Sequence, residues 1–111
     1  MRIFIAGGAG FIGSPMANQL LIGKDAYVVV FDNFTSGREW HLEPHLANPR
    51  LRIVRGDLKD LSAIMDAIAG SDRVYHYASN PDIAKAMVQP DVDFWEGTYL
   101  TQNLLEAMRQ T

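Results

Sequence analysis

The chain contains no cysteine among its 111 residues. This absence excludes disulfides, thiol nucleophiles and zinc–thiolate sites, and it fits a reducing compartment, so we expect a cytoplasmic protein. No apolar run reaches the ~18 residues that a membrane-spanning helix needs. Lys and Arg number 10 against 13 Asp and Glu, with no basic stripe. We therefore expect neither a membrane nor a nucleic acid as a partner.

Several chemical motifs are also absent. No serine lies in Gly-x-Ser-x-Gly surroundings, and no P-loop lysine follows the glycine-rich segment near the amino terminus. These absences argue against a serine nucleophile elbow and against nucleoside triphosphate hydrolysis. His41 and His45 could suggest a metal site, but Pro44 interrupts a helix that would place both on one face, and no third ligand is evident. We expect no metal.

What the chain does contain is an alternation of apolar runs with amphipathic segments. The apolar runs predict strands at Arg2–Ala6, Ala26–Asp32, Leu51–Arg55 and Asp72–Tyr77. The segments between and after them predict helices over Phe11–Ile22, from an N-cap at Asp60 to Gly70, and over Asp91–Gln110. Residues 33–50 are typical of a loop, in which a short helical turn at Arg38–Leu42 would be compatible with the sequence.

The alternation predicts the fold class. The second strand shows no polar alternation, which is typical of a parallel strand buried on both faces. Parallel strands need crossover connections, and these are right-handed. The prediction is an α/β fold, a doubly wound parallel sheet of the Rossmann type that binds NAD(P), with strand order 3-2-1-4. We expect the chain to form one domain, in which the fold is truncated after the fourth strand and the helix that follows it.

Residues 7–13 read Gly-Gly-Ala-Gly-Phe-Ile-Gly and directly follow the first predicted strand. Glycines at this spacing let the backbone turn sharply and approach a pyrophosphate without an intervening Cβ, and the amino end of the next helix can hold phosphates. Gly8, Gly10 and Gly13 match G-x-G-x-x-G, whereas Gly7, Gly10 and Gly13 match G-x-x-G-x-x-G. Spacing alone does not choose between the registers, but either predicts a dinucleotide-binding turn.

Asp32 lies at the end of the second predicted strand, 19 residues beyond Gly13. A carboxylate there can accept hydrogen bonds from the adenosine ribose and would repel a 2′-phosphate, which favours NAD over NADP. Arg38 could instead pair with such a phosphate, although a solvated loop charge is the simpler interpretation. The alternative for the whole pattern is a structural βαβ turn with an incidental aspartate.

Five stretches follow one another in the order and spacing of a known family: Gly7–Ser14, Phe31–Arg38, Gly56–Asp60, Val74–Ser79 and Asn103–Ala107. In these stretches the chain resembles the extended short-chain dehydrogenase/reductases, and among them the NAD-dependent nucleotide-sugar epimerases and dehydratases. The chain departs from the family at Ala6, Pro15 and Gly97, where Thr, His and Asn are usual. These departures concern the tightness of cofactor binding more than the fold.

The resemblance implies a cofactor site made of four groups of residues. The glycine turn would hold the pyrophosphate, the residues after the second strand the adenosine ribose, a pair after the third strand the adenine, and the end of the fourth strand would line the path to the nicotinamide ribose. In that order the residues are Gly7, Gly10, Phe11, Ile12 and Gly13; Asp32, Asn33, Thr35 and Ser36; Asp57 and Leu58; and Tyr77, Ala78 and Ser79. The alternatives are that Asp57 only ends a turn, that Tyr77 belongs to the core, and that His76 is a packed strand histidine.

The resemblance also implies a catalytic Tyr-x-x-x-Lys, in which the lysine lowers the pKa of the tyrosine for proton exchange with a sugar hydroxyl. None of the four tyrosines has a lysine four residues later, so no catalytic residue is assigned. We interpret the chain as the amino-terminal part of a longer enzyme, or a truncated homologue, without the catalytic half and the sugar-nucleotide subdomain. By itself we expect it to be inactive.

The leading functional hypothesis is the NAD-binding portion of a nucleotide-sugar epimerase or dehydratase, whose full-length parent transiently oxidises a nucleotide sugar by hydride transfer. The alternatives are a net NAD(P)-dependent dehydrogenase or reductase of the same superfamily and a non-catalytic dinucleotide-binding module. The final predicted helix carries several apolar residues, and in the resembled family such a helix commonly contributes to a dimer interface. We therefore expect a homo-oligomer.

Overall fold

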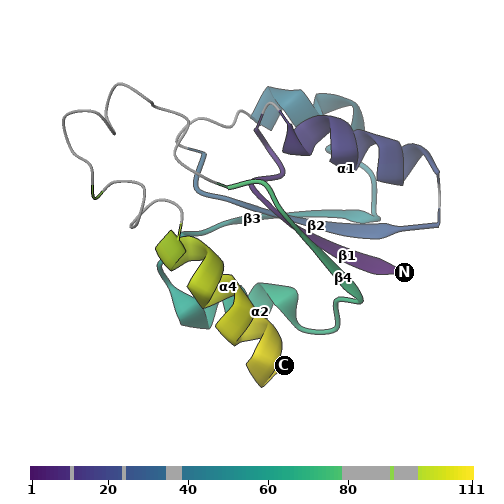
Figure 1. The fold of residues 1–111 in the computed structure, drawn as a ribbon. Helices are drawn as coiled ribbons and strands as arrows, with labels where there is room; N and C mark the ends of the chain where they lie inside the picture. The colour runs from purple at the N-terminus through teal and green to yellow at the C-terminus, as the bar shows by residue number, and fades with distance from the viewer. Residues whose placement is uncertain (11, 24, 35–38, 79–90, 92–97) are drawn as a thin grey trace.

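A parallel sheet forms the centre of the computed structural model, which describes residues 1–10, 12–23, 25–34, 39–78, 91 and 98–111. Its strands are β1 (Arg2–Ala6), β2 (Tyr27–Asp32), β3 (Leu51–Arg55) and β4 (Arg73–His76). They pair in parallel in the order β3-β2-β1-β4, which confirms the predicted topology. Because β1 lies between β2 and β4, it has hydrogen-bonded neighbours on both sides (Figure 1).

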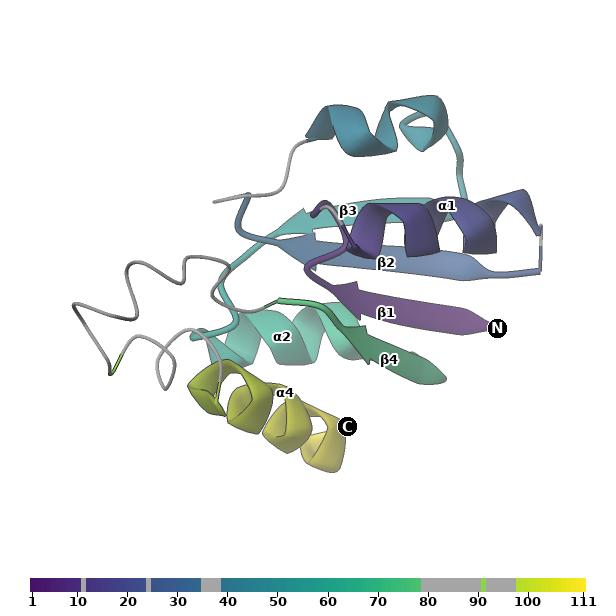
Figure 2. The same ribbon diagram turned by 45° about the horizontal axis from the view of Figure 1, so that its top comes forward.

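Helices cover both faces of the sheet (Figures 1 and 2). On one face lie α1 (Gly13–Ile22) and the 3₁₀ helix η1 (Glu39–His45), and on the other lie α2 (Leu61–Ile68) and α4 (Tyr99–Gln110). This arrangement is the doubly wound fold that the sequence predicts. Within the described ranges, no helix is long and apolar enough to cross a membrane.

The central strands divide their side chains between two hydrophobic clusters. In β1, Phe4 and Ala6 join the cluster under α2 and α4, whereas Ile3 and Ile5 join the cluster under α1. Successive side chains of a strand point to opposite faces, so both faces of β1 must be apolar. The same division in β2 explains why its sequence shows no polar alternation.

The ends of the first two α-helices follow from local chemistry. The N-cap of α1 is Ile12, so Pro15 is the third helical residue, where a missing N–H removes no intrahelical hydrogen bond. The predicted tolerance of this proline is confirmed, although α1 begins two residues later than predicted. The side chain of Asp60 accepts a hydrogen bond from Ala63 N at 3.2 Å and caps α2 as predicted.

Other boundaries differ from the predictions. β2 and β4 each begin one residue later than predicted, and β4 ends one residue earlier. The expected turn at 38–42 is part of η1, which extends to His45 and includes Pro44. The side chain of Leu42 is completely buried under α1, and this packing favours a helical segment where the sequence predicts mostly loop. The long final helix is α4 from Tyr99 onward, and residues 92–97 lie outside the described residues.

At the amino edge of the sheet, Arg2 and Asp72 bind each other through two hydrogen bonds. Asp72 N donates to Arg2 O at 2.7 Å, and Arg2 N donates to the Asp72 carboxylate at 2.8 Å. The Arg2 guanidinium also lies 5.2 Å from the centre of the Tyr27 ring. These contacts connect the starts of β1, β2 and β4, which the register places with Ile3 opposite Arg73.

Candidate functional site

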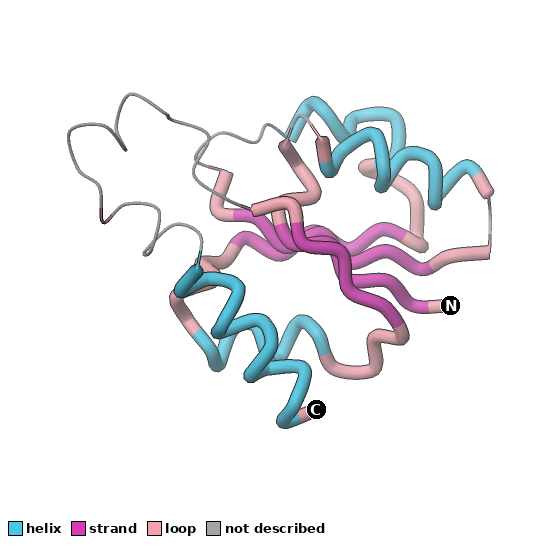
Figure 3. The backbone as a smooth tube through the Cα atoms, in the orientation of Figure 1, coloured by secondary structure: helices cyan, strands magenta, loops and turns pink. Residues whose placement is uncertain are grey.

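The carboxyl ends of the four strands lie at one edge of the sheet, and the loops that follow them gather there (Figure 3). The chain moves outward from β1 to β2 and β3 on one side, and it continues at β4 on the other side of β1. Such a reversal of strand order is where doubly wound folds bind ligands, in the crevice outside the carboxyl ends of the strands. The described members of all four groups of predicted site residues lie at or after these strand ends.

The glycine-rich turn after β1 is fixed by its own backbone. Gly7 has φ of +78°, in the left-handed region that favours glycine, and its N–H donates to Phe31 O at 2.8 Å. The Gly7 carbonyl accepts from Gly10 N at 3.2 Å, and the Gly10 carbonyl accepts from Ser14 N at 3.1 Å. These bonds connect the end of β1 to Ser14 in the first turn of α1.

Side chains are excluded at two glycines because backbone approaches them closely. A Cβ on Gly7 would lie 2.8 Å from Ala78 N and 2.9 Å from the Tyr77 carbonyl carbon. A Cβ on Gly13 would overlap the Gly7 carbonyl oxygen and lie 2.8 Å from Gly8 Cα. A Cβ on Gly8 would likewise lie 2.8 Å from Val30 Cγ1, so close packing constrains the first and last glycines of both registers.

Asp32 is buried, with 8% of its surface exposed, and it ends β2 beside this turn. Its Oδ2 accepts from Ala9 N at 3.0 Å, and its Oδ1 accepts from Phe34 N at 2.7 Å. Because an ionised carboxylate has about four acceptor sites, each oxygen can still accept a further hydrogen bond. The carboxylate is thus held in place with capacity left for a diol.

Phe34 follows Asp32 with φ of 60°, which is uncommon for a residue with a side chain. Its N–H bond to Asp32 and the Arg55 guanidinium, 4.0 Å from the centre of its ring, hold it in this conformation. Asn33, between the two, is exposed. The structure thus places Asp32 and Asn33, the predicted ribose-binding residues, at the carboxyl end of β2, and Asp32 is hydrogen-bonded to the glycine turn.

The predicted adenine pair follows β3. The Asp57 side chain is exposed, and its Oδ1 accepts from Lys59 N at 2.9 Å, which is the turn-forming role considered above as the alternative. Leu58 is buried in the cluster under α2 and α4, and its carbonyl accepts from the Asn103 side chain at 2.9 Å. Gly56 N donates to Asp32 O at 3.1 Å, which keeps this segment next to the end of β2.

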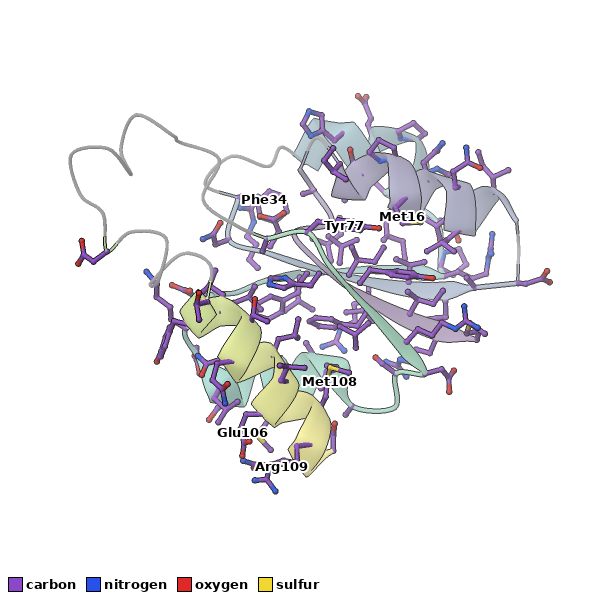
Figure 4. All side chains as sticks on the ribbon, viewed as in Figure 1. Met16, Phe34, Tyr77, Glu106, Met108 and Arg109 are labelled. Atoms are coloured by element: carbon purple, nitrogen blue, oxygen red, sulfur yellow. The ribbon has the colours of Figure 1, made fainter. Side chains whose placement is uncertain are left out.

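The residues after β4 lie beside the glycine turn. Tyr77 N donates to Ala6 O at 2.8 Å, so pairing with the chain of β1 continues to the start of the turn. The Tyr77 ring stacks on Tyr75, with centroids 6.4 Å apart, and lies on the α1 side of the sheet together with Met16 (Figure 4). Tyr77 and Ala78 are partly buried. The Tyr77 side chain therefore packs against the core, while the Tyr77 backbone lies next to Gly7.

His76 points to the opposite face, where its Nε2 lies 2.9 Å from Thr101 Oγ1 on α4. Its Nδ1 is buried and has no hydrogen-bond partner among the described residues, and burial lowers the pKa of this histidine. These contacts fit the interpretation of His76 as a packed strand residue.

Some predicted site residues cannot be placed in this geometry. Phe11, Thr35, Ser36 and Ser79 lie outside the described residues. Ile12 is described as the N-cap of α1, with its side chain exposed.

Two histidines that sequence reasoning considered only as metal ligands have other contacts. His41 Nδ1 donates to Ala9 O at 2.7 Å, and His45 Nε2 lies 2.5 Å from Asn18 Oδ1. Among the described residues, no three His, Cys, Asp or Glu side chains are grouped as a metal site. No spacing pattern in the sequence points to the His41 contact, since it joins η1 to a turn 32 residues away.

Comparison with known proteins agrees with this geometry. Residues 3–111 match the model of the NAD dependent epimerase/dehydratase family. A dTDP-glucose 4,6-dehydratase from Mycolicibacterium smegmatis is 32% identical over 112 residues, which cover 99% of this chain and 33% of that protein.

Solved structures show the same relationship. The dTDP-glucose 4,6-dehydratase DesIV from Streptomyces venezuelae, with NAD bound, has a TM-score of 0.88 and 35% identity over 96% of this chain and 35% of its own. The UDP-glucose 4-epimerase from Thermus thermophilus, in complex with NAD, has a TM-score of 0.85 and 31% identity over 99% of this chain and 34% of its own. The chain spans about one third of the length of these relatives. It belongs to the NAD dependent epimerase/dehydratase family.

Proposed function

We propose that this chain is the NAD-binding portion of a nucleotide-sugar epimerase or dehydratase that transiently oxidises a nucleotide-linked sugar. The observation that carries the proposal is the buried Asp32 carboxylate, hydrogen-bonded to the glycine turn at the edge where the strand order reverses. A dinucleotide needs a turn without side chains, which its pyrophosphate can approach, next to a carboxylate that can accept hydrogen bonds from the ribose hydroxyls. Family membership supports the same cofactor.

In this proposal each part of the edge holds one part of NAD, which accepts a hydride when bound. Backbone amides at the glycine turn and at the start of α1 bind the pyrophosphate. Asp32 and Asn33 bind the adenosine ribose, Asp57 and Leu58 border the adenine, and Tyr77 and Ala78 lead toward the nicotinamide ribose. Phe11, Thr35, Ser36 and Ser79 complete these groups by resemblance to the family.

The preference for NAD over NADP follows from Asp32. A 2′-phosphate would have to approach a carboxylate that two backbone N–H groups hold in place, so it could not avoid the negative charge by a rotation of the side chain. The ribose 2′-hydroxyl of NAD, in contrast, donates to the free acceptor sites. The proposal therefore assigns to Asp32 both the binding of NAD and the rejection of NADP.

Calorimetric titration of the chain with NAD and NADP tests this assignment. We expect tighter binding of NAD, and we expect Asp32→Asn to weaken NAD binding at least tenfold, because hydrogen bonds to a charged group contribute about 1.5–3 kcal/mol. Asp66→Asn is the matched control, since it removes the same charge from an exposed position on α2. Preference of the unmodified chain for NADP would contradict the proposal.

The substrate and the remaining domains belong to the same proposal. Residues 1–111 are the amino-terminal part of a Rossmann domain, and a Tyr-x-x-x-Lys half and a sugar-nucleotide subdomain belong to a longer parent protein. Its substrate is a nucleotide sugar, as the names of the relatives suggest. The observation that supports this division is that the chain aligns with about one third of each relative.

The proposal includes self-association through α4. Leu105 and Met108 on this helix are 55% and 44% exposed (Figure 4 labels Met108). Apolar side chains at this exposure can be buried against a second copy of the chain. Sedimentation of a monomer at high micromolar concentration would contradict this part of the proposal.

A further inference from the structure

The peptide groups on either side of Ala9 are held by two other elements. Ala9 N donates to Asp32 Oδ2 at 3.0 Å, and Ala9 O accepts from His41 Nδ1 at 2.7 Å. The next amide, Gly10 N, donates to Gly7 O at 3.2 Å. The Ala9–Gly10 peptide is therefore hydrogen-bonded at its carbonyl and at its N–H, and the peptide before it is bonded to Asp32.

η1, which carries His41, is itself fixed on α1. Leu42 is completely buried in the cluster under α1, and His45 Nε2 lies 2.5 Å from Asn18 Oδ1 on that helix. Two contacts on α1 thus hold the 3₁₀ helix independently of the bond from His41 to the turn. The imidazole is presented to Ala9 from a fixed position.

The hydrogen bond to Ala9 O requires the His41 imidazole to act only as a donor that holds the peptide in place. A carbonyl oxygen only accepts hydrogen bonds, so Nδ1 of His41 must carry a proton. Both the Nδ1–H neutral tautomer and the imidazolium satisfy this requirement. The contact therefore needs a donor at one defined place and does not need proton transfer.

We infer that His41 is a positioning residue for the cofactor. It fixes the Ala9–Gly10 peptide next to the Gly10 carbonyl, which accepts from Ser14 N in the first turn of α1, the helix end that the proposed function assigns to the pyrophosphate. Because the turn is already ordered, less conformational freedom is lost when the diphosphate binds. This inference rests on the proposed function, since it concerns the binding of NAD.

Three variants separate positioning from general stability. His41→Leu removes the donor, whereas His41→Asn places an amide nitrogen near the position of Nδ1 and can restore the bond to Ala9. His45→Leu removes the contact between η1 and Asn18 and leaves the donor to Ala9 in place. All three are titrated calorimetrically with NAD, and binding of adenosine, which has no pyrophosphate, is followed by NMR.

We expect His41→Leu to weaken NAD binding about fivefold, the factor that one net hydrogen bond contributes, and to leave adenosine binding unchanged. His41→Asn should bind NAD within about twofold of the unmodified chain, and so should His45→Leu. The inference would be overturned if His41→Leu weakened the binding of NAD and of adenosine equally. It would also be overturned if His45→Leu weakened NAD binding as much as His41→Leu does and His41→Asn did not restore NAD binding.

Hydrogen exchange of the Gly10 amide distinguishes failure of this inference from failure of the proposed function. If the unmodified chain does not bind NAD, the proposed function is wrong, and the effect of His41 on the turn is still decided by exchange. Faster exchange of Gly10 N–H in His41→Leu, reversed in His41→Asn, supports the fixed turn. Unchanged exchange in both variants overturns it.

Discussion

Gly13→Ala adds one methyl group at the first residue of α1, where backbone leaves no room for it. The new Cβ would overlap the Gly7 carbonyl oxygen and lie 2.8 Å from Gly8 Cα. Neither atom belongs to a side chain that could rotate away. Gly13 is not among the described glycines with positive φ, so the cost comes from space rather than from the backbone conformation.

Two opposing effects set the magnitude. Alanine is favoured over glycine inside a helix by about 1 kcal/mol. Overpacking typically costs about 1–3 kcal/mol, and the cost should reach or exceed the upper end here because backbone atoms must move. We expect Gly13→Ala to lower the free energy of unfolding by about 2 kcal/mol, and to weaken NAD binding because the turn must open.

Gly23→Ala is the matched control at the other end of the same helix. Gly23 has helical dihedrals, φ −64° and ψ −17°, and an added Cβ would lie 3.5 Å from Leu20 O, an ordinary contact. Alanine there should raise the free energy of unfolding by about 0.4–1 kcal/mol, chiefly because it restricts the unfolded chain. The same substitution therefore has opposite signs at the two ends of α1.

Urea unfolding followed by far-UV circular dichroism measures both variants. The close approach of Gly7 and Gly13 would be refuted if Gly13→Ala destabilised the protein by less than about 0.5 kcal/mol, the usual range for an inconsequential surface substitution. An equal loss in Gly23→Ala would show that the effect belongs to any methyl group added to α1.

Two further predictions concern contacts of α4 and β4. Asn103→Leu removes the donor to Leu58 O and should lower the free energy of unfolding by about 1 kcal/mol, whereas Gln102→Leu, at an exposed position, should not; urea unfolding compares them. Burial lowers the pKa of His76 in the folded chain from its usual value of 6.5. Below pH 6.5 the unfolded chain therefore binds more protons than the folded chain. The free energy of unfolding should fall as the pH drops from 6.5 toward the pKa of the folded state. His76→Gln should reduce this slope in unfolding curves measured on both sides of pH 6.5, and an unchanged slope would assign the pH dependence to other groups.

The strands and their order could be predicted because burial on both faces leaves a continuous apolar run. β1 and β3 have the predicted limits, and the error at β2 and β4 is one residue at an end. The nearness of Asp32 to the glycine turn was also predictable, since parallel strands end at the same edge. The structure places its carboxylate 3.0 Å from Ala9 N.

The contacts that fix the site could not be predicted in this way. His41 lies nine residues after Asp32 on a short 3₁₀ helix, and its bond to Ala9 depends on how η1 packs on α1. The bond from Asn103 to Leu58 joins residues 45 apart, and in the sequence Asn103 is distinguished only by its place in a stretch that resembles the family. A side chain that binds a distant carbonyl leaves no periodic pattern in the sequence, because its partner is chosen by tertiary packing.

The two hydrogen bonds between Arg2 and Asp72 affect the position of residues at the opposite edge of the sheet, where β4 ends. A β-strand has a nearly constant rise of about 3.3 Å per residue. The hydrogen bonds that fix the start of β4 beside β1 therefore also fix the position of its carboxyl end. A slip by one position would exchange the faces of Tyr75 and His76, and would carry the Ala78 backbone out of alignment with Gly7. The alignment of the Ala78 backbone with the glycine turn is therefore set in part by the hydrogen bonds between Arg2 and Asp72, at the opposite edge of the sheet.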